Sequence, residues 1–206
     1  MIKQSIFFLL FFAVAATTFA VENVPDALPS GIKNKIAAPL VAEKYEYYEI
    51  KGNSEKELHE QMCRNGCSVG DGNIYDSVTA WRWRMDYGYD RAPGACSAGS
   101  FKVALEIDYR YPKWVYADNA PKALVDKWND FMKHLVTHEN GHRDIAVEAA
   151  AGLSRAVAAL PPAGSCAELD REVRAQGHER MEKLNADEKS YDVTTGHGKT
   201  QGAVFP

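Results

Sequence analysis

The sequence predicts an α+β fold, because stretches with strand periodicity precede stretches with helical periodicity along the chain. Residues 79–89 and residues 101–111 each alternate apolar and polar side chains, as half-buried strands do. The long segment after Pro121 instead repeats apolar residues at spacings of three and four, as a helix with one buried face does. With 206 residues, 46% of them hydrophobic, the chain is long enough to bury a core.

The first twenty residues are typical of a secretory signal peptide. Lys3 precedes an apolar run that ends in small residues, and we expect cleavage after Ala20. The run is shorter than the roughly 20 apolar residues that a membrane-spanning helix needs. We expect residues 21–43 to form a loosely ordered N-terminal arm and residues 44–206 to form a single domain. The expected location is therefore secreted or periplasmic, without stable membrane insertion after cleavage.

The charge pattern argues against a nucleic-acid partner. The formal net charge is −4 at pH 7, and the chain contains no run of basic residues. Binding to a phosphate backbone depends on clustered Lys and Arg side chains.

Shorter elements are expected before the two alternating strands. Residues 44–52 predict a short strand that ends at a glycine. Residues 54–62 predict a short helix, because Ser54 is followed three residues later by Glu57, the pattern of a capping box. The two alternating strands suit antiparallel pairing across a loop at residues 91–100, and the second strand could bind an extended peptide along its edge.

The long helix is expected to bury one stripe of side chains that includes two histidines. Pro121 suits the first helical turn, and the sequence "LPPAGS" ends the helix. Phe131, Leu135, His138 and His142 follow one another on the stripe. A second, highly charged helix is expected over residues 166–189, followed by a non-helical tail. The expected architecture is thus a small antiparallel or mixed sheet packed on two helices.

The four cysteines indicate disulfides in an exported protein. Three pairings are possible, and we favour Cys63–Cys67 together with Cys96–Cys166. An Asn-Gly pair between the first two cysteines favours a tight turn. The second bridge would close a long loop around the histidines, which the chain-entropy model values at roughly 4 kcal/mol. Metal binding by Cys63 and Cys67 is the weaker alternative.

The long helix carries the motif His138-Glu139-x-x-His142. Residues four apart on a helix lie about 6 Å apart on one face, so the two imidazoles can share one ion. Zinc binds imidazole nitrogen at about 2.0–2.1 Å and prefers four ligands. Glu139 lies beside the same face, where it can take a proton from a metal-bound water. The alternative is a pair of core histidines that hydrogen-bond to protein groups.

A third ligand must come from outside this motif. His134 is excluded, because the eight residues between it and His142 correspond to about 12 Å of helix rise. We favour His197, which has a glycine on each side that lets the backbone turn the imidazole inward. The alternative is a glutamate of the second helix, where Glu168, Glu172 and Glu179 are available.

These motifs resemble a bacterial family of predicted secreted zinc-dependent proteases, which is catalogued as a domain of unknown function. The resemblance covers about residues 47–202. It rests on "TAWRWRMDY", Cys96, "HENGH", Cys166 and "YDVTTGHGKTQG". The resemblance implies a zincin-like fold with metal ligands at His138 and His142 and a catalytic base at Glu139. It also implies that His197 is a ligand.

The expected function is a secreted zinc-dependent metallopeptidase that hydrolyses peptide or protein substrates, with Zn²⁺ as cofactor. Glu139 would accept a proton from zinc-bound water and pass it to the leaving amine. Tyr191 and His178 are candidate oxyanion donors, against a packed tyrosine and an exposed helix histidine as the alternatives. Two other functions stay open. One is a non-catalytic, zinc-stabilised envelope protein with closed coordination, and the other is a zinc amidase acting on peptidoglycan.

Overall fold

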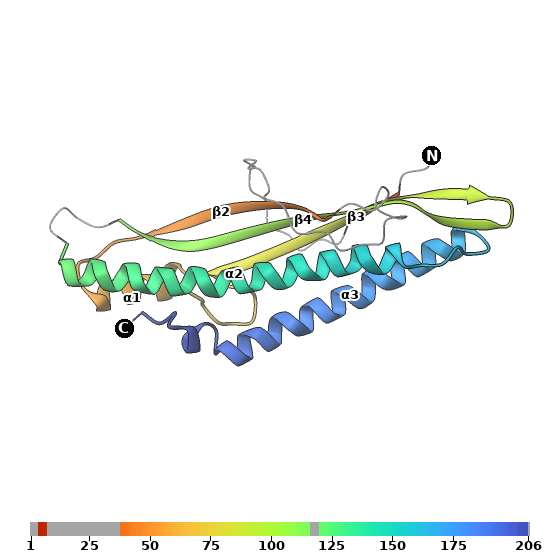
Figure 1. Ribbon diagram of the computed structural model, residues 1–206. Helices are drawn as coiled ribbons and strands as arrows, with labels where there is room; N and C mark the ends of the chain where they lie inside the picture. Colours follow the sequence, from red (N-terminus) through yellow and green to blue (C-terminus); the bar gives the residue numbers. More distant parts are fainter. Residues whose placement is uncertain (1–3, 8–37, 116–119, 206) are drawn as a thin grey trace. The chain divides into compact units, whose positions relative to one another are not determined.

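The computed structural model describes residues 4–7, 38–115 and 120–205. The predicted signal peptide and N-terminal arm lie outside these residues, apart from 4–7 and 38–43. The elements, in chain order (Figure 1), are β1 (Gln4–Phe7), β2 (Leu40–Ile50), α1 (Glu55–Asn65), β3 (Val78–Ala92), β4 (Ala95–Trp114), α2 (Lys122–Ala158), α3 (Cys166–Thr195) and the 3-10 helix η1 (Lys199–Gln201). This order of strands and helices confirms the α+β class.

The strands form one mixed sheet in the order β1-β3-β4-β2. β1 pairs antiparallel with β3, with Gln4 opposite Tyr87. β2 runs parallel to β4, because ring contacts advance along both strands together, from the Tyr45–Tyr109 pair to the Tyr47–Tyr111 pair. β4 therefore lies between β3 and β2 and is not an edge strand of the sheet. The prediction that this strand binds a peptide along its edge is wrong.

The connection between β3 and β4 is shorter than the predicted loop at residues 91–100. β3 continues to Ala92 and β4 begins at Ala95, which leaves Pro93 and Gly94 as the turn. Gly94 has φ +68°, in the left-handed region that glycine adopts without strain. The small residues from Ala95 onward were expected in a loop, but backbone pairing with β3 extends them as a strand.

The chain divides into two compact units, and each is described by itself. Both long helices run through the division, so neither unit is a continuous segment. Unit 1 comprises Met1–Glu43, Trp81–Ile107 and Ile145–Asp187, and unit 2 comprises Lys44–Ala80, Asp108–Asp144 and Glu188–Pro206.

Unit 1 has an apolar core that the strand alternation predicted. The inward side chains in the middle of β3 and those of β4 are buried, whereas Trp81 and Tyr89 are half-buried; apolar residues of α2 and α3 are buried as well. These core residues are Trp83, Met85, Tyr87, Phe101, Val103, Leu105, Ile107, Leu153, Val157, Leu169 and Val173. The predicted Cys96–Cys166 disulfide is confirmed, with a Cα–Cα distance of 5.1 Å and a sequence separation of 70 residues. It ties the start of α3 to β4.

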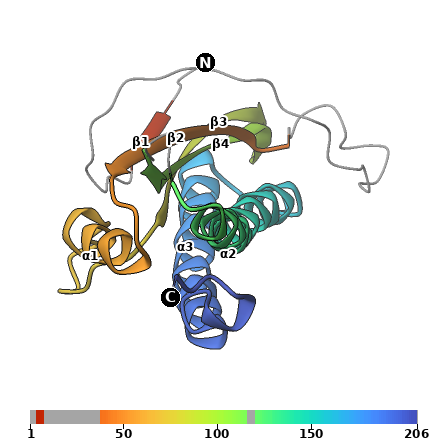
Figure 2. The ribbon, with the colours of Figure 1, turned by 90° about the vertical axis from the view of Figure 1, so that its left-hand side faces the viewer.

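In unit 2 the capping box is confirmed at the start of α1, which follows β2 through a short connection (Figure 2). The Ser54 side chain accepts a hydrogen bond from the Glu57 backbone N–H. The Glu57 carboxylate in turn accepts one from the Asn53 N–H at 2.8 Å. These contacts satisfy N–H groups that lack partners at a helix start.

The predicted Cys63–Cys67 disulfide is wrong, because both thiols are free. The Asn-Gly pair ends a helix here and does not form a tight turn. Asn65 is the last residue of α1 and Gly66 is its C-cap. Cys63 is exposed on α1, whereas Cys67 is buried and pairs through its backbone with Tyr75. Burial raises the pKa of the Cys67 thiol to about 11.

The two long helices differ in how well their ends were predicted. α2 begins and ends where Pro121 and the Pro-Pro pair predicted. α3 continues to Thr195. The prediction of a non-helical tail after residue 189 is therefore wrong up to Thr195. Among the described residues, no helix has both the length and the apolar character that a bilayer crossing requires.

Candidate metal centre

The middle of α2 places the motif residues in the interior of unit 2. His138 is 4% exposed, Glu139 is 3% exposed and His142 is 8% exposed. The apolar stripe predicted the burial of the two histidines, and Phe131 and Leu135 on the same face are also buried. Buried polar side chains need partners, so the contacts of these three residues define the site.

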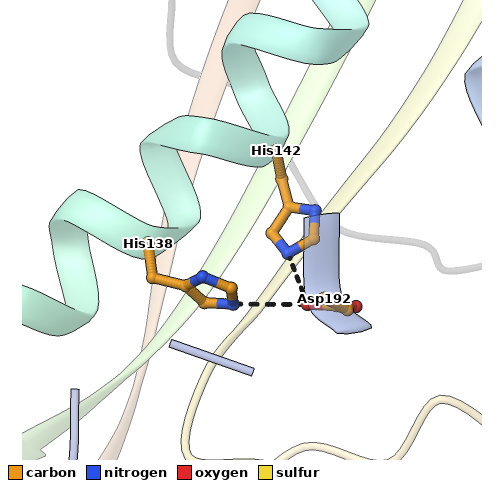
Figure 3. Close-up of side chains that lie close together, drawn as sticks. All are labelled: His138, His142 and Asp192. Carbon is orange, nitrogen blue, oxygen red and sulfur yellow. Dashed lines mark hydrogen bonds and ion pairs between the residues drawn. The ribbon is translucent and has the colours of Figure 1, made fainter. Parts of the chain in front are cut away.

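Both histidines face one carboxylate oxygen of α3. Asp192 Oδ1 lies 3.4 Å from His138 Nε2 and 3.1 Å from His142 Nε2 (Figure 3). The potential ligand atoms of these three residues all lie within 4.8 Å of one another. A single ion can therefore contact all three after small adjustments of the side chains.

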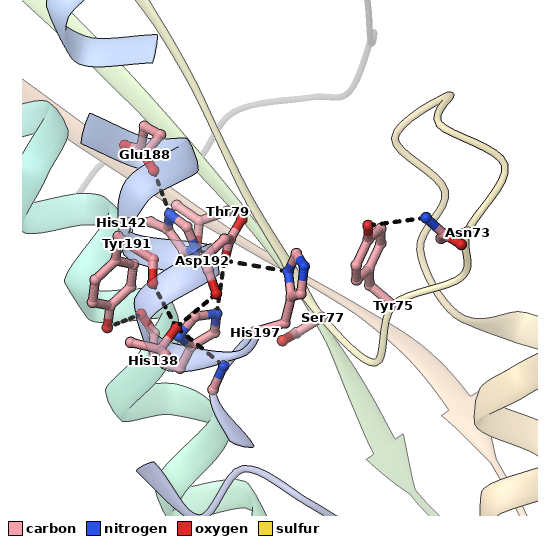
Figure 4. Close-up of polar contacts among 12 residues, drawn as sticks. Asn73, Tyr75, Ser77, Thr79, His138, His142, Glu188, Tyr191, Asp192 and His197 are labelled. Carbon is pink, nitrogen blue, oxygen red and sulfur yellow. Dashed lines mark hydrogen bonds and ion pairs between the residues drawn. The ribbon is translucent and has the colours of Figure 1, made fainter. Parts of the chain in front are cut away.

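The other ring nitrogen of each histidine is held by an acceptor. His138 Nδ1 lies 3.0 Å from Gln201 Oε1. His142 Nδ1 contacts the Glu188 carboxylate (Figure 4). Metal-binding histidines commonly donate their second N–H to such a partner, which leaves the opposite nitrogen free to bind the ion. Both Nε2 atoms have this arrangement, and both point to Asp192.

The centre also holds two carboxylates, Asp192 and Glu188, against imidazoles that are neutral unless protonated, so a divalent cation would balance its charge. Burial of the ring alone would lower the pKa of His142. The hydrogen bonds to Asp192 and Glu188 outweigh this effect and raise the pKa to about 10. Burial alone would raise the pKa of the Asp192 carboxyl group. Hydrogen bonds from His138 and His142 outweigh this effect and lower that pKa. Glu188 Oε1 is buried without a hydrogen-bond partner among the described residues. This donor set therefore fits a divalent cation.

Tyr191 holds α3 against α2 at the centre. Its hydroxyl donates to the backbone carbonyl oxygen of His138 at 3.1 Å and accepts a hydrogen bond from Gln201 at 3.0 Å. Its ring stacks on the His138 ring, with a centroid distance of 5.1 Å, and meets the His142 ring edge-on. The hydroxyl expected to stabilise an oxyanion is thus engaged with backbone and amide groups, and Tyr191 orients both imidazoles.

The close approach of Tyr191 requires a glycine at position 141. A Cβ atom there would lie 2.0 Å from the Tyr191 hydroxyl oxygen and 2.3 Å from its Cζ atom. We expect Gly141→Ala to lower the free energy of unfolding by about 1–3 kcal/mol, because the ring must move away. Chemical denaturation of the purified variant measures this loss.

Gly152→Ala is the matched control on the same helix. The nearest atoms to its added Cβ are the flexible ends of two arginine side chains, Arg180 Nη1 at 3.3 Å and Arg155 Nη2 at 3.7 Å. Alanine is also the better helix former by up to about 1 kcal/mol. A Gly141→Ala protein as stable as the Gly152→Ala protein would contradict the packing of Tyr191 on α2.

His197 lies at the exposed side of the group. Its Nδ1 atom is 3.4 Å from Asp192 Oδ1, its side chain is 52% exposed, and its ring is 5.3 Å from the Tyr75 ring (Figure 4). His197 has φ +53°, an uncommon value for a residue with a side chain, between two glycines that also have positive φ. The flanking glycines turn the chain, but the imidazole stays half exposed and is not turned fully inward. Asp192, which the sequence did not single out, is grouped with the two buried histidines instead.

The Glu139 carboxylate binds two hydroxyl groups. The Ser77 hydroxyl donates to Oε1, and the Thr79 hydroxyl donates to Oε2 at 2.6 Å. Ser77 is 7% exposed, and Thr79 is the second residue of β3. The carboxylate is therefore buried and hydrogen-bonded on both oxygens, and it is not part of the group of potential ligand atoms.

The remaining candidates have ordinary surface contacts. His134 Nδ1 lies 3.3 Å from the Gly202 carbonyl oxygen, and His178 forms an exposed ion pair with Glu182. Glu168 is exposed and accepts a hydrogen bond from the Gly164 N–H before α3. Glu172 and Glu179 are exposed on α3 and are not among the potential ligands.

The model of a family described as "Bacterial protein of unknown function (DUF922)" matches residues 45–198. The chain belongs to the DUF922 family. The DUF922 match includes the three potential ligands and Glu139, and it ends three residues before Gln201. No curated protein and no solved structure matches the chain.

Two acidic residues of this DUF922 protein were missed by the sequence analysis. Glu188 and Asp192 are four residues apart on α3, the same spacing as His138 and His142 on α2. That spacing places each pair on one helix face. The signal was present in the sequence, but it is recognisable only when the helix is extended past residue 189.

Proposed function

We propose that this DUF922 protein is a secreted zinc-dependent metallopeptidase with a zincin-like active site. The observation that carries the proposal is the convergence of two imidazole Nε2 atoms and one carboxylate oxygen, from His138, His142 and Asp192. Catalytic zinc sites typically use three protein ligands of this kind and keep one position for water or substrate. Structural zinc sites more often use four protein ligands, with cysteine among them.

The residues around the ligands have distinct proposed roles. A bound zinc ion supplies Lewis acidity, which makes water a stronger acid and polarises a carbonyl group. Glu139 accepts the proton of the attacking water and delivers it to the leaving amine. Glu188 and Gln201 keep His142 and His138 in the tautomer with Nε2 free, and Tyr191 fixes the plane of the His138 ring.

The Cys96–Cys166 disulfide supports the proposed export. Disulfides form and persist in secreted and periplasmic proteins and are rare in the reducing cytosol. This bridge agrees with the leader-like N-terminus, so the substrate is expected to be a protein or peptide outside the cytoplasm.

A non-catalytic zinc site is the second candidate, and the position of His197 favours it. Its Nδ1 atom lies 3.4 Å from Asp192 Oδ1, so a modest rotation would supply a fourth protein ligand. A site closed in this way binds zinc for stability and has no position for water. X-ray absorption of the zinc-loaded protein distinguishes the candidates, since the closed site has three imidazoles and the open site has two.

Metal content and chelator-sensitive hydrolysis test the proposed function together. We expect the oxidised protein, without its leader, to contain about one zinc ion per chain, because the described residues include one group of three potential ligands. It should degrade casein, lose this activity in a chelator and regain it with zinc. Purified cell wall is assayed in parallel, because the same chemistry can cleave other amides. A metal-free protein whose melting temperature does not respond to zinc would overturn the proposal.

A further inference from the structure

The start of β3 and the residues just before it contact the candidate base directly. Ser77 and Thr79 donate their hydroxyl groups to the two carboxylate oxygens of Glu139. Other contacts anchor this segment: the backbone of Tyr75 pairs with Cys67, and the Tyr48 hydroxyl donates to the Asp76 carbonyl oxygen at 2.7 Å. The two hydroxyls are therefore held in place independently of Glu139.

We infer that Ser77 and Thr79 are positioning residues that aim the Glu139 carboxylate and accommodate it both with and without a proton. The inference rests on the proposed function and names the groups that make Glu139 an effective base. Without them, a glutamate side chain could adopt several rotamers, and a misplaced catalytic group costs large factors in rate.

The chemistry of the hydroxyl group explains why these residues suit the task. A general base must hold a carboxylate before proton transfer and a carboxylic acid after it. Serine and threonine hydroxyls each offer one donor and two acceptor lone pairs. They donate to the carboxylate and, after rotation of the hydroxyl, accept from the acid. A lysine or arginine has only donors and would favour the carboxylate alone.

Single substitutions test the inference in the zinc-loaded protein. Ser77→Ala and Thr79→Val each remove one hydroxyl with little change in volume. We expect each to lower kcat for casein by about 10- to 100-fold, the range seen when an outer hydrogen bond of a metal site is lost. KM and zinc content should stay unchanged, because neither residue is a potential ligand. Thr79→Ser keeps the hydroxyl, so it should retain most of the kcat that Thr79→Val loses.

Ser154→Ala is the matched control for loss of a buried hydroxyl. Ser154 is 5% exposed and donates to the Ala150 carbonyl oxygen on α2. This variant should keep the wild-type kcat. A fall in kcat equal to that of Ser77→Ala would overturn the inference, because general destabilisation would then explain both effects.

Combination with Glu139→Gln shows whether the hydroxyls act through the base. Residues that act as one unit have non-additive effects, so Thr79→Val should not lower the residual activity of Glu139→Gln further. In the metal-free protein, the melting-temperature changes of Ser77→Ala and Glu139→Gln should also be non-additive. Additive effects in both measurements would overturn the inference.

The outcomes separate this inference from the proposed function. A wild-type protein that binds no zinc and cleaves neither casein nor cell wall overturns both. A zinc-dependent hydrolase that keeps its full kcat in Ser77→Ala and Thr79→Val retains the proposed function and overturns the positioning role alone.

Discussion

Glu139→Gln is expected to reduce casein hydrolysis by about 10²- to 10⁴-fold, the contribution that a positioned general base makes. Glutamine matches glutamate in shape but cannot accept the proton of the attacking water. Its amide retains partners, because the oxygen can accept a hydrogen bond and the NH₂ group can donate to the hydroxyls of Ser77 and Thr79. The fold and the zinc content should therefore be preserved, as circular dichroism and metal analysis would report.

Glu148→Gln provides the control for this substitution. Glu148 lies on α2 as well, but it is exposed and pairs with Arg155 at the surface. Exposed ion pairs contribute little to stability, so this variant should match the wild type in all assays. Turnover by Glu139→Gln at the rate of Glu148→Gln would contradict the role of Glu139 as the base.

Asp192→Asn is expected to weaken zinc binding by more than about 100-fold, which exceeds the usual effect of losing an outer hydrogen bond. The substitution preserves shape but removes the negative charge that faces both Nε2 atoms. A neutral amide oxygen is a poor replacement for a carboxylate at zinc. Competition with a chromophoric chelator measures the affinity, and hydrolysis should fall with zinc occupancy.

Two further variants locate the third ligand. Asp187→Asn is the control, because it removes another carboxylate of α3. Among the contacts described, this carboxylate pairs only with Lys183, so zinc affinity should not change. His197→Ala should keep zinc bound, because His138, His142 and Asp192 remain. Loss of zinc in His197→Ala with retention in Asp192→Asn would reverse the assignment and restore His197 as the third ligand.

The buried faces of the strands and of α2 were predictable because periodicity reports burial directly. Trp83 and Met85 alternate with polar residues, and their side chains lie in the core. The histidines follow Phe131 and Leu135 on one helical stripe, so their burial also followed from spacing. The Ser54 cap was local in sequence and equally readable. These features depend on residues within a few positions of each other.

The missed features depend on contacts between distant segments. The end of α3 has little helical periodicity of its own, because most of its residues are charged or polar. Tyr191 packs against Gly141 across 50 residues of sequence, and this tertiary contact accompanies the extra helical turns. At the end of α1, the Asn-Gly pair predicted a tight turn between the two cysteines. Instead, Asn65 is the last helical residue and Gly66 caps the helix. No pattern in the sequence predicted the division into two units.

The imidazole of His142 between two carboxylates has a consequence for the protein without metal. Because its pKa is raised from 6.5 to about 10, the ring is positively charged at neutral pH. This ion pair stabilises the metal-free fold fully below about pH 6.5, and the contribution is lost as the pH rises toward 10. Near neutrality, the proton on His142 thus offsets one of the two negative charges that a divalent cation would offset. The metal-free protein is therefore expected to stay folded and able to bind a cation later.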